Sequence, residues 1–255
     1  MLMLKFMLCA TILTLSLAAA VQAAESPQIS QGFGCNFLEG KGSADLDKWA
    51  AHFDKERAKI DSPELQNMRS VVWMPFRGNV AVDFVWFDGN LTFNEWGKMS
   101  DAWDRSKVGP ALDASFDEVA TCASSGLSSN ERLSQSEKQF ADDGEVMIES
   151  YRCELHPGKT IADSDAALEA WKPVFEKAVK ATNTASFVGR RIPMISGSGY
   201  DLSYFLVWDD ATAYAAGNSA FTADPDSAES GQLFNAAHKC TSALFKGRVV
   251  ARPAS

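Results

Sequence analysis

The chain has 255 residues, with 24 Lys and Arg against 33 Asp and Glu, which gives a formal net charge of −9 at pH 7. This negative balance repels nucleic acid phosphates and anionic lipid headgroups, so we expect neither nucleic acid nor a membrane surface as a partner. No basic cluster in the sequence opposes that interpretation.

The first residues have the pattern of a secretory signal peptide. Lys5 precedes an apolar run from Phe6 to Ala20, and Val21 and Ala23 occupy the small-residue positions before a cleavage site. The run is shorter than the ~20 apolar residues that a bilayer span needs, which argues against a membrane anchor. We therefore assign residues 1–23 to a signal peptide and expect a soluble mature protein that is periplasmic or secreted.

Of five cysteines, Cys9 is removed with the signal peptide. An even number in an exported chain favours disulfides, because the compartment is oxidising. None lies in a C-x-x-C pair, and no histidine has zinc-finger spacing, so we predict no metal site. The cysteines that remain are Cys35, Cys122, Cys153 and Cys240.

The cysteine spacing reveals an internal repeat, because Cys35 to Cys122 and Cys153 to Cys240 span the same number of positions. Other landmarks recur at one constant offset between the two halves: Gly40-Lys41 with Gly158-Lys159, Asp45 with Asp163, Pro75 with Pro193, and Asp83 with Asp201. So many matches in one order indicate a tandem duplication. The predicted modules are residues 24–133 and 146–255, joined by a polar linker at 134–145.

In the first module the sequence pattern predicts strand, helix, strand, strand, helix, strand. Ser43 is the expected cap of the first helix, whose apolar residues from Leu46 to Phe53 recur at helical spacing. Arg77-Gly78-Asn79 is a turn between two strands rich in β-branched and aromatic residues. The expected strands are 32–38, 69–76, 80–87 and 122–133, and the second helical region is 92–121, interrupted at Gly109-Pro110.

The second module repeats this plan. A helix opens at Thr160 and reaches Ala181, and a later helix from Ala211 is broken at Pro225 and resumes toward His238. The expected strands are 147–155, 186–193, 200–208 and 241–250, with a turn at Ser196-Gly197-Ser198-Gly199.

The order βαββαβ is the ferredoxin-like pattern, in which the first strand lies antiparallel beside the last. A cysteine at the end of the first strand then faces a cysteine at the start of the last. Four cysteines allow three pairings, and this pattern selects Cys35 with Cys122 and Cys153 with Cys240. In the chain-entropy model each bridge over so long a loop stabilises the fold by at most about 4 to 5 kcal/mol.

In this topology and in its paired aromatic strands, Phe84-Val85-Trp86 and Leu206-Val207-Trp208, the chain resembles the dimeric α+β barrel superfamily of antibiotic-biosynthesis-monooxygenase-like proteins. The C-x-x-x-x-G-K start of each module also resembles exported bacterial proteins of unknown function. The resemblance implies an α+β fold in which two tandem ferredoxin-like modules pack as a pseudo-dimeric barrel within one chain. It carries no diagnostic catalytic motif, and fold alone does not fix function.

The seven tryptophans suggest an apolar ligand pocket. Trp73, Trp86 and Trp208 lie on predicted strands, and Arg77 is a nearby polar group at a hairpin. These four residues are our candidate ligand-binding residues. The alternative is that the aromatic residues form ordinary core, which is the commoner role at strand spacing.

His238 lies near the end of the last predicted helix, where the other module has Ala120. Some members of the superfamily bind haem through a histidine on the equivalent helix, so the resemblance implies His238 as a candidate axial ligand. The alternative is a histidine that caps a helix end. Pro157-Gly158-Lys159-Thr160 lacks the first glycine of a phosphate-binding loop, because Cys153 stands in its place, and we expect no nucleotide site.

Asp83 and Asp201 are the only acids at matching strand positions, and one acid at each hairpin more often stabilises a turn than forms a catalytic pair. The favoured hypothesis is an exported protein that binds a small apolar or aromatic molecule in a barrel pocket, without a metal or nucleotide. One alternative is an enzyme, either a cofactor-independent monooxygenase-like protein or a haem protein. The other is a structural or interaction module with a filled core.

Overall fold

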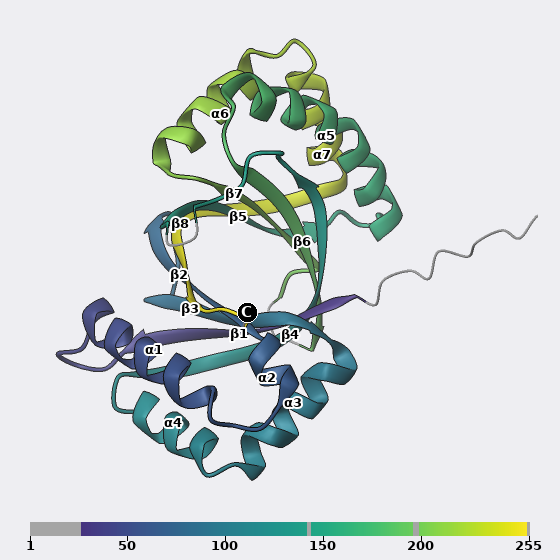
Figure 1. Ribbon diagram of the computed structural model, residues 1–255. Helices are drawn as coiled ribbons and strands as arrows, with labels where there is room; N and C mark the ends of the chain where they lie inside the picture. The colour runs from purple at the N-terminus through teal and green to yellow at the C-terminus, as the bar shows by residue number, and fades with distance from the viewer. Residues whose placement is uncertain (1–26, 142–143, 196–198, 254–255) are drawn as a thin grey trace, which may run out of the picture.

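The computed structural model describes residues 27–141, 144–195 and 199–253. The predicted signal peptide and residues 196–198 of the second predicted turn lie outside these ranges. Eight strands form one closed barrel, and the helices of each half cover opposite outer sides of it (Figure 1). None of the helices in the described ranges combines the length and apolar composition that a membrane crossing requires.

Both halves have the predicted order, with the second helical region split in two. The first half consists of β1 (Gln28–Phe37), α1 (Ser43–Arg57), α2 (Pro63–Asn67), β2 (Arg69–Arg77), β3 (Phe84–Thr92), α3 (Phe93–Arg105), α4 (Val108–Phe116) and β4 (Ala120–Gln135). The second half consists of β5 (Val146–Leu155), α5 (Ile161–Thr182), β6 (Ser186–Ile195), β7 (Leu202–Trp208), α6 (Ala211–Ala223), α7 (Ser227–Ala237) and β8 (His238–Ala251). The short helix α2 has no counterpart in the second half and was not predicted.

The strand order around the barrel is β1-β3-β2-β8-β5-β7-β6-β4. Within each half the strands therefore follow the ferredoxin-like order, with the first strand between the last and the third. Antiparallel pairing of β2 with β8 and of β4 with β6 joins the halves, and closure leaves no strand edge unpaired. The α+β fold of two tandem ferredoxin-like modules in an intramolecular pseudo-dimeric barrel is confirmed.

Both predicted disulfides are formed. Cys35 is bonded to Cys122 and Cys153 to Cys240, each over a sequence separation of 87 residues. In each half the two cysteines are direct neighbours across the antiparallel first and last strands. Each bridge therefore joins the strand that opens a half to the strand that closes it.

Several predicted boundaries were wrong. The loop after β2 is longer than a tight hairpin, because β3 starts at Phe84 rather than at residue 80. Asp83 fixes the position at which β3 begins to pair with β1. Its backbone N–H donates to the Cys35 carbonyl, and its carboxylate accepts from the Phe37 N–H. Gly78, with φ of +104°, ends β2 in a conformation that favours glycine.

Two helix signals were also misplaced. Gly42 rather than Ser43 is the N-cap of α1, and its N–H donates to the Asp45 carboxylate. The break in the second helical region falls before α4 rather than at Gly109-Pro110, which lie in the first turn of α4. A proline is tolerated there because the first N–H groups of a helix have no partner within it.

The predicted linker begins within a strand. β4 continues to Gln135, where it pairs with Phe187 of β6, so the first two residues of the predicted linker belong to the barrel wall. His238 lies directly after α7 and opens β8.

Candidate functional site

Alternation along each strand decides which side chains enter the barrel. In β6, Phe187 and Arg191 line a pocket inside the barrel, whereas Val188 packs outward among the residues beneath the helices. Gly189 lies between Phe187 and Arg191 on the inner face of β6, and a Cβ added to it would lie 2.2 Å from the Phe205 ring. The missing side chain therefore makes room for an aromatic ring inside the barrel.

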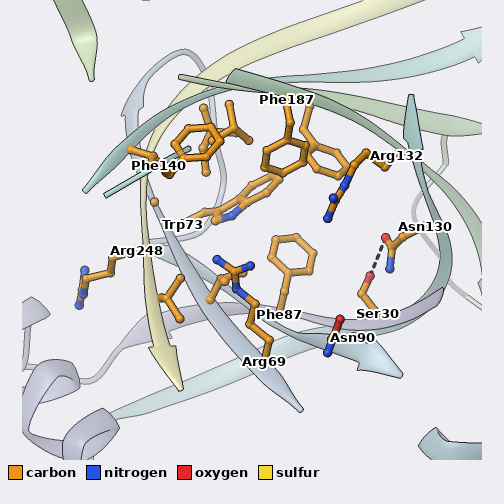
Figure 2. Close-up of a pocket in the computed structure, with 18 of the residues that line it drawn as sticks. Ser30, Arg69, Trp73, Phe87, Asn90, Asn130, Arg132, Phe140, Phe187 and Arg248 are labelled. Carbon is orange, nitrogen blue, oxygen red and sulfur yellow. Dashed lines mark hydrogen bonds between the residues drawn. The ribbon is translucent and has the colours of Figure 1, made fainter. Parts of the chain in front are cut away.

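The interior of the barrel contains a cavity of about 580 Å³, which we call the barrel pocket. Aromatic rings from several strands and from the segment before β5 form much of its wall (Figure 2). These rings belong to Trp73, Phe87, Phe140, Phe187 and Phe205. The aromatic wall makes the barrel pocket suitable for a ligand with an apolar body.

Arg191 is the charged group that projects into this aromatic interior. Its guanidinium carbon lies 3.8 Å from the ring centroid of Phe87, 4.4 Å from that of Phe205 and 4.5 Å from that of Trp73. Its Nε donates to Asn130 Oδ1 at 3.2 Å, and the same oxygen accepts from the Ser30 hydroxyl at 3.1 Å. We call the three rings around this cation the Arg191 cage.

The charge of Arg191 has no acidic partner within the described residues, because none of their ion pairs includes it. Burial lowers the pKa of Arg191 to about 9, which leaves the guanidinium charged at neutral pH. The cage rings stabilise the cation through their negative faces, by about 2 kcal/mol or more for a desolvated pair.

Four further arginines line the barrel pocket: Arg69, Arg132, Arg248 and Arg252. Figure 2 shows Arg69 and Arg132 near the Trp73 and Phe87 rings, whereas the Arg248 side chain extends away from them. Burial and the positive charges of Arg252 and Arg132 lower the pKa of Arg69, so these side chains are close enough to repel one another. Arg248 pairs with Asp47, outside the pocket lining.

Glu131 is the one acid among the described lining residues, and its carboxylate is already engaged. It accepts from Nε and Nη2 of Arg190 at 3.2 and 2.6 Å, and Arg190 also pairs with Asp165 of α5. Arg190 and its neighbour Arg191 therefore have opposite roles, because strand alternation directs one outward to acids and the other inward to rings. The described lining of the barrel pocket carries excess positive charge.

Of the five candidate ligand residues, only Trp73 lines the barrel pocket. Arg77 lies at the exposed end of β2, with its guanidinium carbon 4.2 Å from the Phe76 ring centroid. Trp86 and Trp208 lie on the outer face of the sheet, each beneath the helices of its own half. The barrel does not bring these residues together.

His238 lies in a buried polar group beneath α7. Its Nδ1 donates to the Phe234 carbonyl at 2.8 Å, and its Nε2 accepts from the Ser164 hydroxyl at 2.9 Å. The Tyr204 hydroxyl lies 3.3 Å from the same Nε2. Burial lowers the pKa of His238, which favours the neutral ring.

A second, smaller cavity of about 260 Å³ lies between the second half's sheet and its helices, and we call it the helix-side cavity. Its lining includes Tyr151, Trp171, Tyr204, Phe221, Gly231 and Phe234. Both ring nitrogens of His238 already make hydrogen bonds, and the cavity is smaller than the ~300 to 1,000 Å³ of usual ligand pockets. The residues present therefore do not fit a haem ligated by His238.

Within the described ranges, no group of three or more His, Cys, Asp or Glu side chains could hold a metal ion. Asp83 and Asp201 both accept a hydrogen bond from a backbone N–H, of Phe37 at 2.9 Å and of Leu155 at 2.7 Å. Asp83 therefore links the start of β3 to β1, and Asp201 links the start of β7 to β5.

No family model matches the sequence, and no curated protein matches it. Solved structures do share its fold. An anthrone oxidase-like protein is 12% identical with a TM-score of 0.55, and the match covers 91% of this chain and 97% of that one. A Fusobacterium nucleatum protein with a provisional monooxygenase description is 10% identical with a TM-score of 0.55, over 89% of this chain and 94% of its own.

A third structure, with a provisional chlorite dismutase description, is 13% identical with a TM-score of 0.50, over 89% of this chain and 96% of its own. These matches extend over both halves, so this chain shares its barrel fold with these proteins. At such identities the likeness concerns the fold alone.

Proposed function

We propose that this chain is an exported protein that binds a small molecule with an apolar or aromatic body in the barrel pocket. The observation that carries the proposal is the cavity of about 580 Å³ inside the barrel, walled by aromatic rings. The interior of an eight-stranded barrel is either filled by side chains or holds one small ligand. This volume falls within the ~300 to 1,000 Å³ of ligand pockets.

Titration with N-phenyl-1-naphthylamine, a neutral apolar fluorophore, tests the proposal. We expect its fluorescence to rise on binding and to saturate at one site per chain. Val71→Trp places a larger side chain in the barrel pocket and should weaken binding at least tenfold. Leu38→Trp, at an exposed position that lines neither cavity, is the matched control and should bind normally.

Failure of the wild-type chain to bind the probe would favour the structural or interaction module. Binding that survives Val71→Trp would exclude the barrel pocket and direct attention to the helix-side cavity.

Export is supported by the two disulfides, because such bonds persist in oxidising compartments. Expression of the full chain with its first 23 residues tests this part of the proposal. We expect the intact mass of the mature protein to correspond to a chain that begins at residue 24 and contains no free thiol. Retention of the first residues would contradict export through a cleaved signal peptide.

A second candidate is a monooxygenase-like activity without a cofactor, at the helix-side cavity. It is supported by the contact of the Tyr204 hydroxyl, at the cavity wall, with Ser164 at 2.5 Å and with His238. A neutral His238 can accept, by way of the Tyr204 hydroxyl, a proton that a substrate in the cavity releases, and the hydroxyl regains a proton as it passes one on. Oxygen consumption with an anthrone, lost in Tyr204→Phe, would support this activity, and no consumption by the wild-type chain would remove it.

A further inference from the structure

We infer that the ligand of the barrel pocket is an anion, an aromatic or apolar carboxylate or sulfonate, and that Arg191 binds its charged group. The inference rests on the proposed function and specifies the chemistry of its ligand. Three features of the described residues carry it: the charge of Arg191, which has no acidic partner among them, the excess of arginines around the pocket, and the aromatic cage.

The first feature is the charge itself. Arg191 is half-buried, and withdrawing an unpaired cation from water is unfavourable, so an anion bound to its guanidinium would restore part of the lost solvation. A guanidinium carries five N–H donors, and within the described residues only the Nε donor of Arg191 has a protein acceptor, Asn130. Its Nη groups are the paired donors that a carboxylate or sulfonate can accept from together.

The second feature is the sign of the surroundings. The chain has a net charge of −9, yet five arginines and one acid line the described part of this pocket. Glu131 is engaged by Arg190 and Arg248 by Asp47, which leaves four of these arginines without an acidic partner among the described residues. A cleft lined by one sign of charge concentrates ligands of the opposite sign. Arg69, Arg132 and Arg252 are exposed members of the lining, so their charges can attract an anion toward the pocket.

The third feature is that the cation is held in place before a ligand arrives. Trp73, Phe87 and Phe205 surround the Arg191 guanidinium, and Asn130 fixes its Nε. A side chain already ordered in this way loses little further freedom when it binds an anion. The neighbouring rings of Phe140 and Phe187 then offer apolar contact to the body of the ligand.

Two matched probes test the inference. 8-Anilino-1-naphthalenesulfonate and N-phenyl-1-naphthylamine share one ring skeleton, and only the first carries a negative charge. We expect the wild-type chain to bind the sulfonate at least tenfold more tightly. Arg191→Gln should remove this preference, so that the ratio of the two affinities falls from at least tenfold to about one.

Arg191→Lys is the second variant, because it keeps the charge and loses the two parallel donors, and it should retain part of the preference. Arg77→Gln, at an arginine outside the pocket, is the control and should behave as wild type. A preference that survives Arg191→Gln would overturn the role of Arg191.

A measurement on the unaltered chain guards against a variant that fails to fold. In competition with the bound neutral amine, 2-naphthoate should displace it at concentrations at least tenfold lower than 2-naphthalenemethanol. Equal displacement by both would overturn the anion preference while leaving the proposed binding function intact. Absence of any binding by the neutral amine would instead overturn the proposed function itself.

Discussion

In the first half, three rings fill the space between sheet and helices: Trp49, Phe53 and Trp86 have centroids 5.1 to 5.4 Å apart. The second half repeats part of this arrangement, with Phe175 against both Trp171 and Trp208. The surroundings of the rings differ. In the first half, Phe116 of α4 packs edge-on against Trp49. In the second half, Trp171 of α5 and Gly231 of α7 line the helix-side cavity instead.

The hydrogen bonding of buried polar groups is also less complete in the second half. In the first half the Trp86 indole N–H donates to Asp88 at 2.8 Å. The buried side-chain atoms that lack a partner in the described residues all belong to the second half: Glu149 Oε2, Ser186 Oγ and Trp208 Nε1. The same disulfide-linked arrangement of strands and helices therefore surrounds a more fully packed core in the first half than in the second. We expect the second half to be the less stable.

The disulfides offer the largest test of that comparison. Cys35→Ser/Cys122→Ser and Cys153→Ser/Cys240→Ser each open a bridge over 87 residues, so each should lower the free energy of unfolding by up to about 4 to 5 kcal/mol. Guanidinium denaturation of both double variants would measure the losses. A much larger loss from the second pair would show that the incompletely filled half depends more on its bridge.

Asp88 should give the first half a pH dependence. Burial raises its pKa to about 6, although Ser70 and Trp86 both donate to it. Between about pH 4 and 6 the folded chain holds a proton that the unfolded chain has released, so stability should fall as the pH rises through this window. Asp88→Asn should abolish this fall of about 3 kcal/mol, as measured by urea denaturation at pH 4 and 7.

The equivalent tryptophans should respond unequally to phenylalanine. Trp86→Phe removes ring volume and also a donor to buried Asp88, so we expect a loss of about 2 to 3 kcal/mol. Trp208→Phe removes an N–H that has no partner among the described residues, so the free energy of unfolding should fall by about 1 kcal/mol. Equal losses in denaturation experiments would contradict the difference in polar satisfaction between the halves.

His238 should give the second half a pH dependence of opposite sign. Burial lowers its pKa, so its contribution is present above pH 6.5 and is lost as the pH falls through the folded-state pKa. The effect should be smaller than that of Asp88, because the Phe234 carbonyl accepts from the ring and partly offsets burial. The free energy of unfolding of Asp88→Asn, measured from pH 7 down to 5 with and without His238→Gln, isolates the contribution of His238. If both variants showed the same pH dependence, this prediction would be wrong.

Two glycines in the second half's helices provide a further test of how fully that half is packed. A Cβ at Gly231 would meet no atom within 4 Å, so Gly231→Ala should stabilise the chain by about 0.5 to 1 kcal/mol. A Cβ at Gly217 would lie 2.2 Å from the Trp208 ring, so Gly217→Ala should destabilise it by about 1 to 3 kcal/mol. The melting temperatures of both variants would show whether an added methyl group is tolerated at Gly231, which lines the helix-side cavity, and not at Gly217.

The sequence predicted the chain path of this protein well. The equally spaced cysteines, the helix that opens at Thr160 and the repeated order of elements can be recognised along the chain, and each has its expected place in the structure. Matching Asp83 and Asp201 proved to be backbone acceptors at equivalent strand ends. Boundaries failed where a distant strand decides them, as at the start of β3.

The candidate site could not be predicted in the same way. Trp86 was a candidate for the pocket and lies outside the barrel, whereas Arg191 was overlooked and lies inside it. Adjacent Arg190 and Arg191 look alike in sequence, and only the register of β6 between β4 and β7 directs one to acids and the other to rings. Covalent bonds and local periodicity determined the order of the elements from sequence alone. Which side chains face the cavity was decided by closure of the barrel, because closure fixes the inner face of every strand at once.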